Sequence, residues 1–193
     1  IGDIFTTDNI HFRNEPGNGL HHYMIFADPS NARGGDFFAL TLTAIDENGF
    51  MWLLDSFSCN RIEKVLVAEQ IKKWQKDYPI KVTFIETNGE YGQKFFRDCH
   101  LSKIPVESWY SRQDKYERIM SNFDVITEKT FFVDNENNRN FANQIYTFRN
   151  PDEKIDKDGN RIEKEEVYDD NIDCLNNAAM AYILVFKELK VLF

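Results

Sequence analysis

Short apolar runs separated by turn residues dominate the first third of the chain. Runs of this length, continuously apolar or alternating with polar residues, are typical of buried strands. Asp46-Glu47-Asn48-Gly49 stands between the second run and the third and predicts a hairpin turn. Strands are therefore predicted at 22–28, 37–45 and 50–57.

After residue 60 the pattern becomes one of helices that alternate with short strands. Apolar residues recur at helical spacing between Arg61 and Tyr78 and predict an amphipathic helix that Pro79 ends. Its apolar positions are Ile62, Val65, Leu66, Ile71 and Trp74. Further helices are predicted at 89–99, 114–123, 138–148 and 171–189, and further strands at 81–85, 105–110 and 130–133. This order indicates an α/β fold, a mixed central sheet with helices on both faces.

Two segments lack such periodicity. Residues 1–20 contain the turn-rich stretch Asn14-Glu15-Pro16-Gly17-Asn18-Gly19, which predicts a linker or lead-in to a domain at 21–193. Residues 152–167 are mostly charged around Asp158-Gly159-Asn160 and predict a solvated hairpin or loop. The chain starts at Ile1 with no signal-peptide pattern, so we expect a domain excised from a longer protein, with its neighbour before residue 1.

Composition and charge narrow the class of protein. Of 193 residues, 42% are hydrophobic and 15% aromatic, enough for one globular domain with a proper core. The formal net charge of −9 argues against binding of nucleic acid by bulk electrostatics, although an enzyme that engages DNA locally remains compatible with it. The three cysteines have no Cys-x-x-Cys spacing, so neither a disulfide framework nor a zinc ribbon is encoded.

The start of the last predicted helix carries the clearest chemical signal. Tyr168-Asp169-Asp170-Asn171-Ile172-Asp173 places three carboxylates within one helical turn. One aspartate there would cap backbone N–H groups and complement the helix dipole. Three repel one another unless cations or protons compensate, so the cluster suggests a divalent-metal site.

Two further acids, Asp28 and Glu86, each stand at the end of a predicted strand. Each directly follows an apolar strand run, Met24-Ile25-Phe26-Ala27 and Val82-Thr83-Phe84-Ile85. Either one alone is best explained as an ordinary surface acid. Because open α/β sheets place their sites at strand ends, the two together with the helix-start acids favour one metal site.

These residues, in this order, resemble the nuclease domain of phage large terminase subunits. The resemblance rests on Asp28-Pro29-Ser30 through Gly34-Gly35-Asp36, on Ile85-Glu86-Thr87-Asn88-Gly89 and on Tyr168-Asp169-Asp170-x-x-Asp173, and it runs from about residue 22 to 187. It implies a ribonuclease H-like fold and a metal-dependent endonuclease that cuts concatemeric double-stranded DNA. It also implies an N-terminal ATPase domain of the same polypeptide, absent here, the portal and small terminase subunit as partners, and action in the host cell cytoplasm.

The resemblance also assigns residue roles. Asp28, Glu86 and Asp170 would be catalytic, and with Asp169 and Asp173 they would hold two Mg²⁺ or Mn²⁺ ions. Which of Asp169 and Asp170 is the principal ligand stays open, and Asp173 is expected as a supporting ligand or helix cap. The DNA backbone would be contacted by Arg112, Lys115 and Arg118. An ordinary solvated helix face explains these three basic residues equally well.

Two alternatives remain at this stage. A transposase, integrase or Holliday-junction resolvase would use the same fold and acids. A docking domain of the packaging machine would keep the fold without catalysis. No Walker-type Gly-x-x-x-x-Gly-Lys, Gly-x-Ser-x-Gly or Cys/His motif occurs in the chain, which argues against ATPase and acyl-transfer chemistry in this segment.

Overall fold

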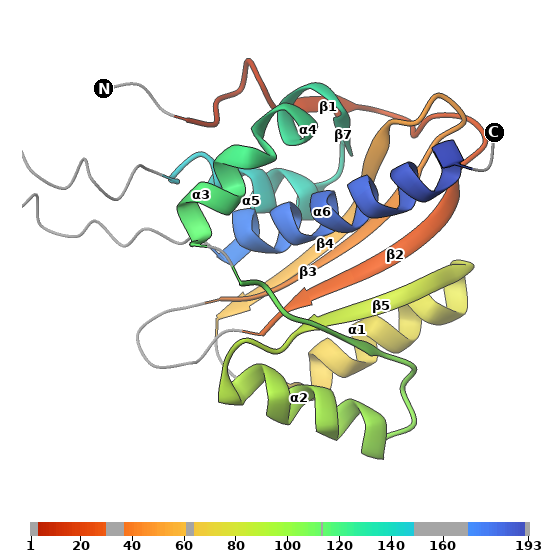
Figure 1. Cartoon of the computed structure of the whole chain (residues 1–193), viewed down its shortest axis with the longest axis vertical. Coiled ribbons are helices and arrows are strands. Elements are labelled where there is room, and N and C mark those ends of the chain that lie inside the picture. The colour runs from red at the N-terminus through yellow and green to blue at the C-terminus, as the bar shows by residue number, and fades with distance from the viewer. Residues whose placement is uncertain (1–3, 30–36, 61–63, 113, 149–169, 192–193) are drawn as a thin grey trace, which may run out of the picture.

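A seven-stranded mixed sheet forms the centre of the computed structural model, which describes residues 4–29, 37–60, 64–112, 114–148 and 170–191 (Figure 1). Its strand order is β1-β7-β4-β3-β2-β5-β6. Antiparallel pairing joins β2, β3 and β4, and the other neighbouring pairs are parallel. The strands are β1 His11–Arg13, β2 His21–Asp28, β3 Phe37–Ile45, β4 Met51–Asn60, β5 Ile80–Glu86, β6 Glu107–Trp109 and β7 Thr130–Val133.

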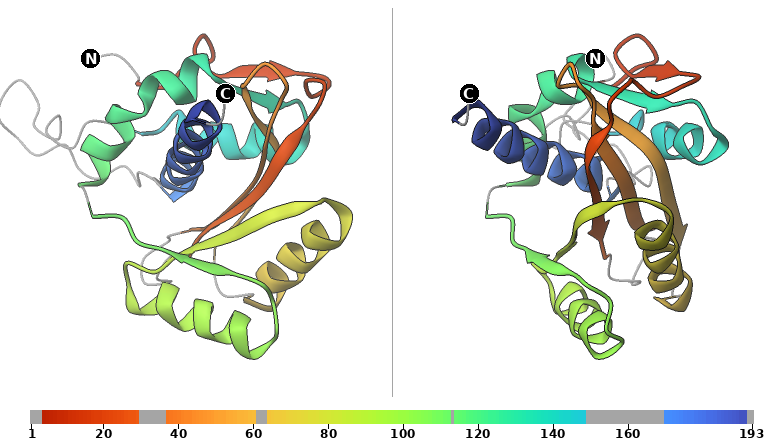
Figure 2. Two further views of the ribbon diagram at one scale, coloured as in Figure 1. Left: turned by 45° about the vertical axis from the view of Figure 1, so that its right-hand side comes forward. Right: turned by 90° about the vertical axis from the view of Figure 1, so that its right-hand side faces the viewer.

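Helices cover both faces of this sheet, as predicted. The described helices are α1 Lys64–Asp77, α2 Glu90–Leu101, α3 Lys115–Ser121, α4 Phe123–Glu128, α5 Glu136–Ile145 and α6 Asp170–Val191. In Figure 2, α1 and α2 lie on one side of the sheet and α3, α4 and α6 on the other, while α5 packs against β4 and α6. Within the described ranges, no helix combines the length and the apolar character that crossing a membrane requires.

Alternate residues of the central strands explain why both faces are covered. On β3, Ala39 and Ile45 pack into the core beneath α6, whereas Leu40 and Leu42 pack into the core beneath α1 and α2. All four are fully buried. Strands with two buried faces are apolar almost throughout, which is the pattern that predicted them.

The turn between β3 and β4 forms as the sequence predicted. The Asp46 carboxylate accepts hydrogen bonds from the backbone N–H groups of Asn48 and Phe50, both at 2.9 Å. Gly49 has φ +80°, a conformation that glycine adopts without the steric cost of a Cβ. The predicted hairpin is confirmed.

Two features differ from the prediction, and a third prediction is not tested by the described residues. Within the predicted lead-in, β1 pairs with β7 and Phe5 and Ile10 are buried, a contribution too short to show periodicity in the sequence. The helix predicted at 114–123 is confirmed as α3, which ends before Asn122, whose side-chain amide donates to the Arg118 carbonyl (3.1 Å), but the helix α4 that follows was not predicted. The charged stretch 152–167 lies outside the described residues.

The buried face of α1 also differs from the prediction. Val65 and Leu66 were expected on that face but are 68% and 44% exposed, so this expectation was wrong. Ile71 and Trp74, which were also expected there, are buried, and Val67 joins them at helical spacing.

Candidate metal centre

Asp28 and Glu86 lie side by side because β2 and β5 are parallel neighbours. Ala27 pairs with Ile85, so the next residue of each strand reaches the same edge of the sheet. Phe26, two residues before Asp28, belongs to the core under α6, and side chains two apart on a strand share a face. Both carboxylates therefore face α6, and both are buried, at 7% and 8% exposure.

The first turn of α6 brings further acids over this edge. Cys174 is fully buried there, and its Sγ donates to the carbonyl oxygens of Phe26 (3.4 Å) and Ala39 (3.5 Å). These contacts seat the helix directly on β2 and β3. Asp170 and Asp173, three residues apart, share one helix face and are both buried.

Three carboxylates converge at this point. Asp28, Glu86 and Asp173 each offer one oxygen, and these oxygens lie within 4.8 Å of one another. A cavity of about 290 Å³ adjoins them. Its lining residues are Asp28, Pro29, Glu86, Asn88, Gly89, Lys115, Arg118, Asp170 and Asp173. Converging, buried, oxygen-only donors fit a hard divalent cation such as Mg²⁺ or Mn²⁺.

The electrostatics of the cluster also fit a cation. Burial, followed by the nearby charges of Asp173 and Glu86, raises the pKa of Asp28 well above its usual range. Burial and Asp173 raise the pKa of Glu86, while hydrogen bonds with Asp28 and Ser111 act against that rise. Like charges that are crowded together and shielded from water by burial favour protons, and a bound cation relieves the same repulsion.

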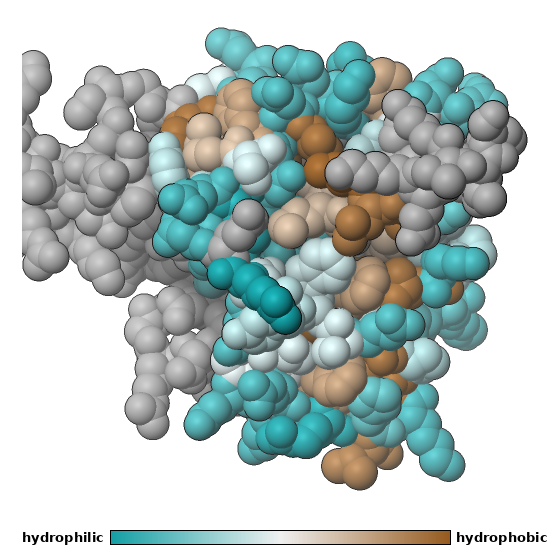
Figure 3. Space-filling view, in the orientation of Figure 1, coloured by the Kyte–Doolittle hydropathy of each residue, from teal (hydrophilic) through white to brown (hydrophobic). Residues whose placement is uncertain are grey.

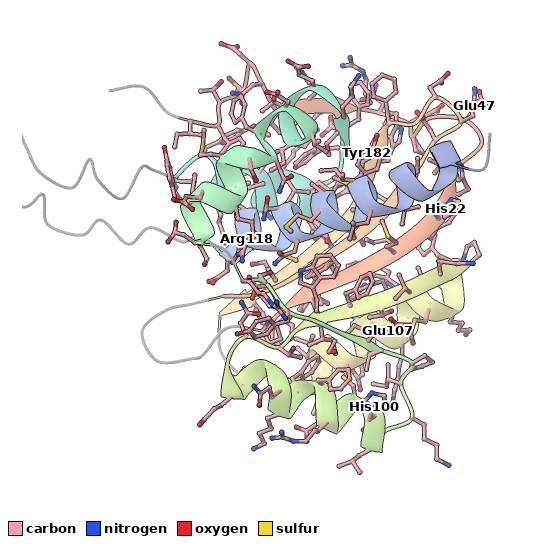
Figure 4. All side chains as sticks on the ribbon, in the orientation of Figure 1. His22, Glu47, His100, Glu107, Arg118 and Tyr182 are labelled. Atoms are coloured by element: carbon pink, nitrogen blue, oxygen red, sulfur yellow. The ribbon has the colours of Figure 1, made fainter. Side chains whose placement is uncertain are left out.

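Two basic residues from α3 compensate Asp173. The buried Arg118 guanidinium donates to Oδ1 of Asp173, and Lys115 Nζ lies 3.3 Å from Oδ2. Figure 4 shows Arg118 where α3 meets the start of α6. The two oxygens of one carboxylate thus have different cationic partners, one buried and one 36% exposed.

Supporting residues that sequence reasoning did not single out surround Glu86. Ser111 N–H donates to Asn88 Oδ1 (2.9 Å) and Asn88 Nδ2 donates to the Ser111 carbonyl (2.8 Å), which ties the segment after β6 to the segment after β5. The Ser111 hydroxyl oxygen also lies 3.1 Å from Asn177 Oδ1. The signal available in the sequence was the set of amides within the otherwise apolar last helix, Asn171, Asn176 and Asn177.

The expected site residues are distributed as follows. Asp170 lines the cavity but lies outside the converging group, whereas Asp173, expected in a supporting role, is a member of it. Asp169 falls outside the described residues. Lys115 and Arg118 line the cavity, and Arg112 is exposed and does not. The surface over α2 and α3 is mostly hydrophilic (Figure 3).

Comparison with protein families gives one match that covers most of the chain. The sequence model of the family described as "Terminase RNaseH-like domain" matches residues 25–183. All four described carboxylates of the site fall within that range. No curated protein matches the chain significantly.

Solved structures with the same fold include three phage terminases. The large terminase of a thermophilic bacteriophage, solved over a longer chain, aligns at TM-score 0.66 and 12% identity, over 93% of this chain and 44% of that one. The nuclease domain of bacteriophage SPP1 g2p, solved with bound Mn, gives 0.63 and 11% over 90% and 97%. The large terminase nuclease of the thermophilic phage G20c, solved with bound magnesium, gives 0.60 and 15% over 92% and 96%. The fold is therefore ribonuclease H-like, and the chain spans under half the length of the first of these proteins.

Proposed function

Because the chain belongs to the terminase ribonuclease H-like domain family, we propose that it is a divalent-metal-dependent endonuclease that hydrolyses phosphodiester bonds of double-stranded DNA. The observation that carries the proposal is the convergence of Asp28, Glu86 and Asp173 beside an open cavity. Two fold neighbours with bound Mn or magnesium support it.

The proposed metal ligands are Asp28, Glu86 and Asp173, with Asp170 and the neighbouring Asp169 completing the set for two ions. Bound Mg²⁺ or Mn²⁺ would activate a water and stabilise charge on the leaving oxygen of the phosphodiester. The protein supplies the rest of the site. Adjacent parallel strands fix Asp28 and Glu86, and Ser111 and Asn88 hold the segment beside Glu86 in place.

For the DNA backbone we propose Arg112, which is exposed just before α3, and Lys115, which is partly exposed at the start of that helix. Phosphate oxygens are the usual partners of such residues. Arg118 was expected to join them, but its side chain is only 4% exposed and is paired with Asp173. We therefore assign Arg118 to the positioning of Asp173 rather than to direct DNA contact.

The wider setting is also part of the proposal. The domain would cut concatemeric DNA within a viral packaging complex in the host cytoplasm. Its partners would be an ATPase domain in the same polypeptide, the portal and the small terminase subunit. The support for these partners is family membership.

A plasmid-nicking assay tests the proposed activity. Supercoiled plasmid incubated with the domain and Mn²⁺ is expected to become nicked and linear, and EDTA is expected to prevent this. Asp28→Asn should lower the rate by at least about a hundredfold, because it removes a carboxylate at the reacting centre. The matched control is Asp77→Asn at the exposed end of α1, which should cut like the wild type. Equal rates for Asp28→Asn and the wild type would contradict the proposal.

A further inference from the structure

Among the described residues, the cavity lining carries more negative than positive charge. In this part of the chain the lining has four carboxylates, those of Asp28, Glu86, Asp170 and Asp173, and two cations, those of Lys115 and Arg118. When all are ionised, four negative charges face two positive charges. A metal-free site of this kind holds whatever cations are within reach, since buried like charges repel strongly.

The two basic residues differ in how firmly they are held. Arg118 is 4% exposed and pairs with Oδ1 of Asp173. When the Asn176 side-chain amide is oriented with its oxygen toward Arg118, that oxygen accepts a hydrogen bond from Nε (3.2 Å). Lys115 reaches Oδ2 of Asp173 from the first residue of α3 and is 36% exposed. A lysine ammonium on its flexible side chain exchanges partners readily. A buried arginine guanidinium, which is planar and can make two parallel hydrogen bonds, does not.

We propose that Lys115 is an exchangeable counterion of the metal centre, which holds Oδ2 of Asp173 while no metal is bound and yields that oxygen to an incoming divalent cation. The inference rests on the proposed metal site and concerns how cations enter it. Arg118 keeps Oδ1, so Oδ2 is the oxygen of Asp173 that a metal can use. An ammonium left a few ångströms from a divalent cation would repel it, and the exposed lysine can move outward.

The consequence is a competition that metal-binding measurements detect without DNA or catalysis. Lys115→Met removes the charge and keeps the length of the side chain. In this variant Mn²⁺ no longer has to displace an ammonium, and we expect it to bind about tenfold more tightly than to the wild type. Lys115→Arg retains the charge and is expected to bind Mn²⁺ no more tightly than the wild type.

The experiment is a titration of metal-free protein with Mn²⁺, followed by the electron paramagnetic resonance signal of the free ion. Lys73→Met on the exposed surface of α1 makes the same change in net charge away from the cavity and should bind like the wild type. Thermal unfolding with and without Mn²⁺ gives a second readout. The rise in Tm caused by Mn²⁺ should be larger for Lys115→Met than for the wild type.

The outcomes separate this inference from the proposed function. If Lys115→Met and the wild type bind Mn²⁺ equally, or the variant binds more weakly, Lys115 is not a displaced counterion, although the metal site stands. If tighter binding is equal in Lys115→Met and Lys73→Met, the effect is one of net charge and the inference fails. If none of the proteins binds Mn²⁺, both the metal site and the inference are overturned.

Discussion

Gly92 lies directly against the end of β5, so close that a Cβ there would sit 2.1 Å from the carbonyl oxygen of Glu86. The contact is with backbone, which cannot rotate away as a flexible side chain can. The first turn of α2 can therefore pack this closely against Glu86 only because residue 92 has no side chain.

Gly92→Ala should destabilise the protein and disturb the metal centre together. Relieving the overlap requires α2 or the end of β5 to shift, at a cost of about 1–3 kcal/mol in the free energy of unfolding. We expect weaker Mn²⁺ binding as well. Gly89→Ala is the comparison, because nothing lies within 4 Å of a Cβ at Gly89. For Gly89→Ala, urea unfolding should show a decrease of at most about 1 kcal/mol in the free energy of unfolding, because the residue that caps α2 has changed. Equal losses for the two variants would refute the coupling.

The metal-free protein should become less stable as pH rises. The pKa of Asp28 is raised above its ordinary 3.8 by burial and then by Asp173 and Glu86. The folded state therefore keeps a proton that the unfolded chain releases. The free energy of unfolding falls as pH rises from about 4 through the raised pKa. Asp28→Asn should flatten this dependence and stabilise the metal-free protein at neutral pH.

Urea unfolding in EDTA between pH 4 and 8 measures this effect as a difference between wild type and Asp28→Asn. Carboxylates away from the site contribute equally to both proteins, so the difference isolates Asp28 together with Glu86, whose pKa depends on Asp28. A variant with the same pH dependence as the wild type would refute the assignment.

Loss of Arg118 should be costly, and the cost should depend on Asp173. Arg118→Met leaves a buried carboxylate with one oxygen lacking its partner, and removing one member of a buried ion pair destabilises by about 3 kcal/mol. The double variant Arg118→Met/Asp173→Asn should recover much of that loss. A double-mutant cycle by urea unfolding gives the coupling free energy between Arg118 and Asp173. Strictly additive decreases in the free energy of unfolding would argue against an interaction between these two residues.

Ser111→Ala should impair metal binding more at low pH than at high pH. A hydrogen bond from Ser111 lowers the pKa of Glu86, so its loss raises that pKa further. Protons then compete better with the metal for Glu86, and the competition fades once the carboxyl is ionised. Mn²⁺ affinities measured at pH 6 and pH 8 should show the larger deficit at pH 6. An equal loss of Mn²⁺ affinity at pH 6 and pH 8 would indicate that Ser111 has a purely structural role.

Some of the site could be predicted from the sequence because it depends on local patterns. Asp28 and Glu86 each follow an apolar strand, and the pairing of those strands as parallel neighbours brings them together. Helical spacing places Asp170 and Asp173 on one face of α6. Which of them joins Asp28 and Glu86 depends on how the helix is seated, and contacts such as Cys174 on the carbonyl of Phe26 decide that.

The role of Arg118 could not be predicted because its partner is 55 positions away in the chain. In the sequence it is one of three basic residues at a helix start, a pattern equally typical of phosphate binding and of a solvated face. Burial distinguishes it from Arg112, which is exposed. Burial of that kind arises from packing between α3 and α6, elements that no local pattern relates.

Anomalous diffraction from crystals grown with Mn²⁺ tests the central claim most directly. The account predicts anomalous density within about 2.5 Å of carboxylate oxygens of Asp28, Glu86 and Asp173. It also predicts that the density disappears in Asp28→Asn crystals grown in the same way. Full Mn²⁺ occupancy elsewhere with none at these three residues would contradict it.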